Sequence, residues 1–173
     1  MAKPKRVGHL VLNVKNLDES TKFYSEVLGF EIALQRPTGT FLTCGKIHHD
    51  LALFQAPEGA MPVTEGQLGL NHFAVQVEDI NDLKEVYDEL KDSGASMDTN
   101  TDHGMTSSIY FFDPDGNKIE FFCNNTDTAS EGLDLMRSPE RINKEFEYDK
   151  KIKLLEILWE IILADGKIHD FET

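Results

Sequence analysis

The sequence has few cysteines. Only two of its 173 residues are cysteines, Cys44 and Cys123, and they lie far apart in the chain. This excludes a disulfide-rich scaffold and any Cys-x-x-Cys metal or redox motif. We therefore expect both thiols to be reduced and buried, as is usual for a cytoplasmic protein.

Basic residues and long apolar runs are also scarce. The chain has 17 Lys and Arg against 31 Asp and Glu, a formal net charge of −14. Such acidity makes nucleic acid and anionic membrane poor partners. No apolar run reaches the 18 residues of a membrane span, and no apolar segment of a signal peptide follows the basic N-terminus. We expect a cytoplasmic protein.

The remaining composition is that of an ordinary globular chain. Hydrophobic residues make up 40% of the sequence and charged residues 28%. The length suits one domain, or one domain with an appendage, and is enough to bury a core.

An internal repeat of about sixty residues organises this chain. Each copy begins with an alternating apolar strand, continues with an amphipathic helix and ends with short strands. In the first copy the strand is expected at 7–14, the helix at 16–28, and the short strands at 30–34, 40–43 and 50–54. In the second copy the strand is expected at 71–77, the helix from Asp79 to Gly94, and the later strands at 107–112 and 118–123.

The repeat divides the sequence into five segments. We expect a first module at 1–56, a linker at 57–69, a second module at 70–125, a polar connector at 126–149, and a C-terminal helix at 150–173. The last segment contains the run IKLLEILWEIILA, which is too apolar to stand alone in water. It is expected to pack on the domain, on a partner chain or on sequence not included here.

Glu120 lies in the apolar run IEFFC, just after the tight turn Asp-Pro-Asp-Gly. Strand side chains alternate between faces, so Glu120 points away from the core that receives its two neighbours. A carboxylate in such a run is costly to bury unless something pairs with it. The alternative is an edge strand with Glu120 in water.

Two histidines occupy matched positions in the repeat, His9 and His72, each on the face of the first strand that lies away from the helix. If the two modules form one curved cup, both histidines and Glu120 point into it. Two imidazoles and one carboxylate make the facial triad that binds non-haem Fe(II). A single histidine of this kind is more often a hydrogen-bonded core residue. Three ligand-capable residues at matched positions of a repeat are much less likely to occur by chance.

The first copy offers no equivalent carboxylate, because aligning LALF with IEFF puts Ala52 opposite Glu120. Three protein ligands leave adjacent coordination sites for a bidentate substrate and for dioxygen. Fe(II) suits this task because it can pass an electron to dioxygen, and Mn(II) fits the same ligands.

Three further polar groups flank the predicted triad. His49 precedes the last strand of the first copy, His103 precedes a strand of the second copy, and Tyr110 lies on that strand. A neutral histidine exchanges protons near physiological pH, and a tyrosine can hydrogen-bond an oxyanion. The alternatives are solvated loop residues for His48, His49 and His103, and a core aromatic for Tyr110.

The order T-D-H-x5-I-Y-F-F-D-P-D-G-x3-E, from Thr101 to Glu120, resembles the motif of type I extradiol ring-cleavage dioxygenases of the catechol 2,3-dioxygenase kind. These belong to the vicinal oxygen chelate (glyoxalase, bleomycin resistance and dioxygenase) superfamily. The resemblance covers about residues 7–125, and the run FLTCGKIHHDLALF resembles the first-module histidine segment. It implies an α+β fold in which two paired βαβββ modules form a half-open β cup with the helices outside.

The resemblance also implies site residues and an activity. His9, His72 and Glu120 match the iron ligands. His103 matches the histidine that assists dioxygen activation and proton transfer. Tyr110 matches the tyrosine that binds the catecholate oxygen, and His49 matches a histidine near the substrate. The implied function is an Fe(II)-dependent oxidoreductase that opens an aromatic diol with both atoms of dioxygen, giving a muconic semialdehyde type product.

Two departures from the family are visible. Most members have four modules and about twice this length, so here the pocket is wider or is completed by a partner, and a dimer is expected. The tail LLEILWEIILADGKIHDFE resembles instead the opening of a tellurite-resistance-type helical domain, and an oligomerisation helix is the alternative. The competing functions are a glyoxalase-like lyase or isomerase, against which Ala52 argues, and a non-catalytic binding module.

Overall fold

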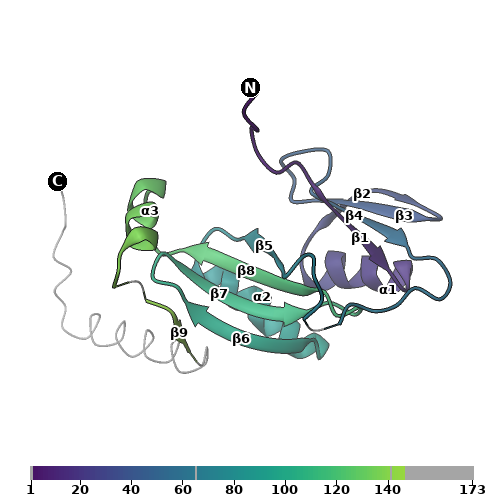
Figure 1. Cartoon of the computed structure of the whole chain (residues 1–173). Helices are drawn as coiled ribbons and strands as arrows, with labels where there is room; N and C mark the ends of the chain where they lie inside the picture. Colours follow the sequence, from purple (N-terminus) through teal and green to yellow (C-terminus); the bar gives the residue numbers. More distant parts are fainter. Residues whose placement is uncertain (1, 65, 141, 147–173) are drawn as a thin grey trace, which may run out of the picture. The chain divides into compact units, whose positions relative to one another are not determined.

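A computed structural model describes residues 2–64, 66–140 and 142–146 of the chain (Figure 1). These residues fall into two compact units, one formed by residues up to 98 together with 109–123, the other by 99–108 together with the chain from 124. The C-terminal helix expected at 150–173 lies outside the described residues.

The first half of the chain forms a four-stranded sheet with the strand order β1-β4-β3-β2. The strands β1 and β4, which come first and last in the sequence, lie side by side and run parallel. The other neighbouring strands run antiparallel. The elements are β1 (Leu10–Val14), α1 (Leu17–Lys22), the π-helical turn η1 (Phe23–Val27), β2 (Glu31–Arg36), β3 (Gly39–Thr43) and β4 (Leu51–Gln55).

The second half forms a five-stranded sheet with the order β5-β8-β7-β6-β9. Here too the first strand of the repeat, β5, runs parallel to the last, β8. The elements are β5 (Phe73–Gln76), α2 (Ile80–Ser93), β6 (Ser96–Asp102), β7 (Thr106–Phe112), β8 (Lys118–Asn124), α3 (Ala129–Arg137) and β9 (Lys144–Glu145).

The strand pairing confirms the internal repeat and its alignment. In the first sheet Val11 lies opposite Ala52, and in the second sheet Ala74 lies opposite Glu120. Val11 and Ala74 each come two residues after the matched histidine of their copy. Ala52 and Glu120 are therefore equivalent positions, as the sequence predicts, and the α+β class with two sheets is confirmed.

Local capping explains where the helices begin and end. The Asn16 side chain accepts a hydrogen bond from the backbone N–H of Glu19, and Asp79 accepts from two backbone N–H groups of α2. Gly94 ends α2 with a φ of +74°, which a residue with a Cβ rarely adopts. The helix expected at 16–28 changes to π geometry at Phe23, which the periodicity did not predict.

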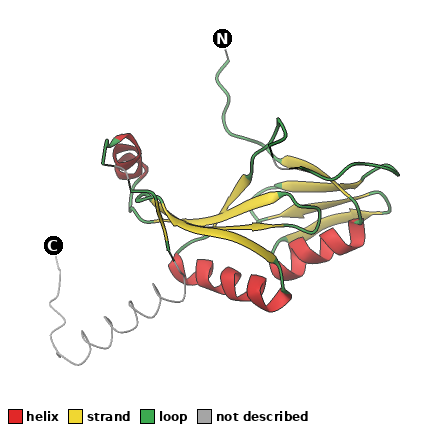
Figure 2. Ribbon diagram, turned by 60° about the horizontal axis from the view of Figure 1, so that its bottom comes forward, coloured by secondary structure: helices red, strands yellow, loops and turns green. Residues whose placement is uncertain are grey.

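Alternation along the strands sends one face of each sheet into a core. In the second half Ile109, Phe111, Ile119 and Phe121 are almost fully buried, while the residues between them point to the opposite face. Figure 2 shows α1 and α2 on one side of the strands. The helix-free face of each sheet is therefore the face that carries the matched histidines.

The Asp113-Pro114-Asp115-Gly116 turn ties the two halves together within the first unit. The Tyr24 hydroxyl of η1 donates to Asp113 Oδ2 at 2.8 Å, in a buried position. The backbone N–H of Lys15 donates to the Asp115 carboxylate at 3.1 Å, and the Ser20 hydroxyl also donates to it. The turn that precedes Glu120 is thus held from both sides.

Three features differ from the sequence expectation. The polar run at 96–102 forms β6, although it has too few apolar residues to be recognised as a strand. The connector at 126–149 contains α3, which starts with a Thr128 and Glu131 capping box, and β9. Cys123 is buried and both cysteines are free, but the expected burial of Cys44 is wrong, because its loop leaves it exposed.

Among the described helices, none combines the length and the apolar character that a membrane crossing requires.

Tyr24→Phe tests the buried link to the turn. Removing the hydroxyl leaves the Asp113 carboxylate with one partner fewer, so the free energy of unfolding should fall by about 1–3 kcal/mol in urea titrations near pH 7. Ser25→Ala is the matched control, because its hydroxyl bonds only to the Thr21 carbonyl one turn earlier in the same helical segment. An unfolding midpoint for Tyr24→Phe equal to that of the parent would contradict the link.

The same pair of proteins makes a pH prediction. Burial, and then the charge and hydrogen bond of Asp113, raise the pKa of Tyr24 well above its usual value. The contribution of the protonated phenol is therefore present below about pH 10 and is lost as the pH rises through the raised pKa. The stability difference between parent and Tyr24→Phe should shrink at alkaline pH.

Candidate active site

His72 and Glu120 meet on the helix-free face of the second sheet. The register that sets Ala74 opposite Glu120 brings the two side chains together, with His72 Nε2 and Glu120 Oε2 3.1 Å apart. Glu120 is only 9% exposed, so water screens it poorly. Glu120 is thus paired rather than solvated in this structure, and its expected pairing with a metal stays a prediction.

Asn71 lies beside the other ring nitrogen of His72. Its side-chain oxygen is 2.7 Å from His72 Nδ1. A carboxamide oxygen accepts, so this contact is a hydrogen bond when Nδ1 carries a proton. In the neutral imidazole Nε2 then has a lone pair and no proton, and it faces a carboxylate oxygen that also only accepts. A proton or a metal cation is needed between these two atoms.

The donor set fits a metal ion. Ligand bonds of about 2.1 Å at right angles hold two donor atoms about 3.0 Å apart, close to the 3.1 Å between His72 Nε2 and Glu120 Oε2. A hydrogen bond from the second ring nitrogen to an acceptor, as Asn71 provides, is the usual support of a metal-binding histidine. The pair therefore suits two adjacent ligand positions.

Tyr110 borders the pair. Its ring packs edge-on against His72, with centroids 5.5 Å apart. Lys118, two residues before Glu120 on β8, places its ammonium group 5.2 Å from the centre of the Tyr110 ring and forms an ion pair with Asp98. The phenol is thus positioned from two sides, next to the atoms that could hold a metal.

His9 and His49 lie together at the first sheet. Their ring centroids are 4.6 Å apart, and His48 Nδ1 lies 2.6 Å from His49 Nδ1. Burial, and then the neighbouring imidazoles of His48 and His9, hold the pKa of His49 below its usual value. His49 is therefore neutral near pH 7 and available as a hydrogen-bond donor and acceptor.

The structure does not bring all three predicted ligands together. Across the part of the chain that it describes, no three His, Cys, Asp or Glu side chains converge to hold a metal. His72 and Glu120 form one cluster, and His9 belongs to the other, with His48 and His49. All these residues lie in the first compact unit.

His103 belongs to the second compact unit. It lies in the turn between β6 and β7, where its backbone N–H donates to the Thr106 carbonyl at 2.9 Å. Its Nδ1 lies 2.6 Å from Asn143 Oδ1, a contact that is a hydrogen bond when Nδ1 carries a proton.

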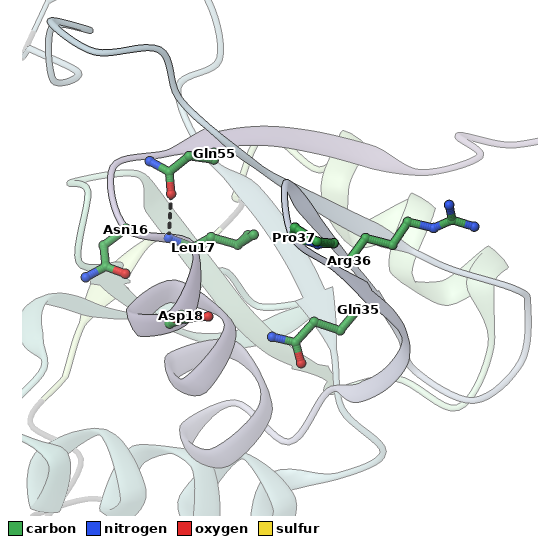
Figure 3. A pocket seen from close by; sticks show the side chains of 7 residues that line it. All are labelled: Asn16, Leu17, Asp18, Gln35, Arg36, Pro37 and Gln55. Carbon is green, nitrogen blue, oxygen red and sulfur yellow. Dashed lines mark hydrogen bonds between the residues drawn. The ribbon is translucent and has the colours of Figure 1, made fainter.

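None of the predicted site residues lines the pocket drawn in Figure 3, which has a volume of about 480 Å³. It is bounded by the start of α1, the β2–β3 turn and Gln55, whose side-chain oxygen accepts a hydrogen bond from the Leu17 N–H at 3.1 Å. A larger pocket of about 860 Å³ lies under the linker and includes Lys15 and Asp115. Neither pocket is lined by His72 or Glu120.

Sequence reasoning missed three residues at these sites. Asn71 could have been found, since it directly precedes His72. Lys118 could have been found too, since it is two residues before Glu120 and therefore on the same strand face. Asn143 carried no signal, because its partner His103 is 40 residues away and its segment was expected to be a connector.

Comparisons with known proteins give the family. The profile of the family described as Glyoxalase/Bleomycin resistance protein/Dioxygenase superfamily matches residues 6–121. Biphenyl-2,3-diol 1,2-dioxygenase 3 of Rhodococcus globerulus is 37% identical over 78% of this chain and 72% of that protein. Metallothiol transferase FosB of Staphylococcus haemolyticus is 31% identical over 67% of this chain and 81% of that protein.

A solved structure shows the same fold. The glyoxylase/bleomycin resistance protein/dioxygenase domain from Frankia sp. EAN1pec superposes with a TM-score of 0.61 at 23% identity, covering 71% of this chain and all of that one.

Asn71→Leu tests whether the carboxamide supports a metal ligand. The substitution removes the acceptor for His72 Nδ1–H, so affinity for Fe(II) or Co(II) should fall about 10–100-fold in anaerobic competition with a chromophoric chelator. Asn71→Asp keeps an acceptor and should retain affinity near that of the parent. Asn81→Leu, an exposed asparagine of α2, is the control. Parental affinity in Asn71→Leu would show that the contact does not support metal binding.

Proposed function

The chain belongs to the glyoxalase, bleomycin resistance and dioxygenase superfamily, and within it we propose that it is an Fe(II)-dependent extradiol dioxygenase that opens an aromatic diol. The observation that carries the proposal is the His72–Glu120 pair, in which an imidazole nitrogen and a carboxylate oxygen, both common metal ligands, lie 3.1 Å apart beside the Tyr110 ring. The relative named biphenyl-2,3-diol 1,2-dioxygenase 3 supports the choice of substrate class.

His72 and Glu120 hold the metal in this proposal, with His9 as the third protein ligand. When bound, Fe(II) supplies a Lewis acid for the diol oxygens and an electron source for dioxygen. Mn(II) fits the same donors, and the donor set alone does not select between the two ions.

The protein's own groups position the substrate and handle its proton. The Tyr110 hydroxyl donates to a diol oxygen, which carries negative charge when the diol binds. His103, whose Nδ1 lies 2.6 Å from Asn143 Oδ1, accepts and returns a proton in this proposal. His49, held neutral by its surroundings, provides a hydrogen bond beside His9.

A second copy of the chain completes the site in this proposal. Among the described residues no cluster joins His9 to the His72–Glu120 pair, and tight Fe(II) binding needs three ligands. On the His9 face of the first sheet the apolar side chains of Val11, Leu34 and Phe54 are 48%, 44% and 36% exposed. Their strand partners place them all on this one face.

An exposed apolar sheet face of this kind is typical of a protein interface. In the proposed dimer it covers the His72–Glu120 face of the partner subunit, and the half-open cup expected from the sequence forms between two copies. Twofold symmetry then gives two identical sites, each with His9 from one copy and the other two ligands from its partner.

A thiol transferase is the second candidate, favoured by the similarity to metallothiol transferase FosB. Members of one superfamily can share a metal site and differ in the reaction that it serves. A lyase or isomerase that needs a carboxylate from both modules is disfavoured, because the position equivalent to Glu120 is Ala52.

Anaerobic reconstitution with Fe(II), followed by catechol or 2,3-dihydroxybiphenyl in air, tests the proposal. Iron-dependent formation of a yellow ring-opened product is expected. The second candidate would be favoured by a different result. In that case the protein binds iron and consumes no diol of a substituted series, but it transfers a thiol to an electrophilic acceptor.

His72→Ala and Glu120→Ala should each abolish iron binding, because the two remaining ligands cannot hold Fe(II) tightly. Iron per chain is measured after desalting under anaerobic conditions. Glu26→Ala, which removes an exposed carboxylate of η1, should leave the iron content unchanged. One iron per chain in either ligand variant would refute the ligand set.

Tyr110→Phe should keep the iron and lower kcat by about 100-fold, because it removes a donor aimed at a charged oxygen. Tyr87→Phe is a matched control, since Tyr87 has the same 9% exposure but lies on α2. A kcat equal to that of the parent would make Tyr110 a packing residue only.

A further inference from the structure

The segment at 142–146 is fastened along β6. Within it β9 pairs antiparallel with β6, so that Thr101 lies opposite Glu145 and Asp102 opposite Lys144. The Phe146 N–H donates to the Asn100 carbonyl at 2.9 Å. We call residues 142–146 the strap. The backbone beside Asn143 is therefore fixed by a ladder rather than free in solvent.

The strap also runs close to the turn that carries His103. Gly104 follows His103 with a φ of +83°, and a Cβ added at this glycine would lie 3.6 Å from the Cβ of Ile142. Only the missing side chain of Gly104 thus separates the turn from the residue before Asn143. A side chain at position 104 would be strained by its backbone conformation as well.

Asn125 holds the other side of the same turn. Its backbone N–H donates to the Met105 carbonyl at 2.8 Å, and its side-chain N–H donates to the Gly104 carbonyl at 3.2 Å. The Gly104 N–H donates in turn to Asp102 Oδ1 at 2.8 Å. The backbone around His103 is therefore set before any ligand binds.

Against this fixed frame, Asn143 Oδ1 lies 2.6 Å from His103 Nδ1. The oxygen accepts, so the contact is a hydrogen bond when Nδ1 carries a proton. A neutral imidazole with its proton on Nδ1 has its lone pair on Nε2.

We propose that Asn143 is a positioning residue that holds His103 in its Nδ1–H tautomer, and that the strap exists to present it. This rests on the proposed function in one respect, namely that His103 moves a proton during ring opening. The tautomer itself is a property of the protein without iron or substrate.

The strap explains why a residue 40 positions away can do this. Asn143 is exposed and contributes little to the core, so its hydrogen bond alone would be a weak constraint. The ladder to β6 holds its backbone beside the turn of His103, where Ile142 lies close to Gly104. The segments that carry Asn143 and His103 are therefore each held by their own backbone hydrogen bonds.

The direct test is ¹⁵N NMR of the full chain with labelled histidine, comparing the parent with Asn143→Leu and Asn143→Asp. The parent should show His103 as the Nδ1–H tautomer. Asn143→Leu should shift the His103 signals toward a mixture of tautomers, and Asn143→Asp should restore the single form, since a carboxylate oxygen also accepts. Asn124→Leu, an exposed asparagine at the end of β8, should change nothing.

Kinetics supply the second readout. With iron content equal to that of the parent, Asn143→Leu should lower kcat about tenfold or more and leave KM within about twofold, because it affects a proton transfer and not substrate contacts. Asn143→Asp should recover most of kcat.

A parent-like His103 spectrum in Asn143→Leu would overturn the proposal, as would a loss of kcat that Asn143→Asp does not rescue. If the parent opens no diol, the proposed function fails, and the tautomer measurement still decides whether Asn143 orients His103.

Discussion

The close approach of His72 and Glu120 is the constraint on which the site depends. Glu120 Oε2 and His72 Nε2 are 3.1 Å apart, and Asn71 Oδ1 lies 2.7 Å from the other ring nitrogen of His72. With Glu120 only 9% exposed, water screens its charge poorly, so a proton or a metal cation between the two atoms stabilises the arrangement. Strand pairing, the anchored turn before β8 and the Asn71 contact all serve to keep this geometry.

The register of the repeat explains why only one half of the chain carries such a pair. Each sheet pairs its first strand parallel to its last, and the same register sets Ala52 and Glu120 at equivalent places. Duplication thus supplies two similar scaffolds, and divergence at one position leaves a carboxylate in one. The first sheet contributes His9 with the neutral His49, and an apolar face that needs a cover.

Much of the fold could be read from the sequence because strand alternation and helix caps are local. The parity of β8 put Glu120 on the face of His72, and Asp79 and Gly94 marked the ends of α2 as predicted. The β6 strand was missed because its polar residues carry no alternation. The alternation along a strand determines the face to which a side chain points. It does not determine which sheet faces lie opposite each other, so the sequence could not predict that His9 and His72 belong to different clusters. Asn143 depends on a pairing between distant segments, for which the sequence has no signal.

The most direct test is a heterodimer of one His9→Ala chain and one His72→Ala chain, isolated by two different affinity tags and loaded anaerobically with Fe(II). If His9 completes the site of the partner subunit, one of the two sites keeps all three ligands, and the heterodimer should bind about half the iron of the parent dimer. Each homodimeric variant should bind none. A heterodimer without iron, beside a parent that binds it, would contradict the account, because each chain would then need its own His9, His72 and Glu120.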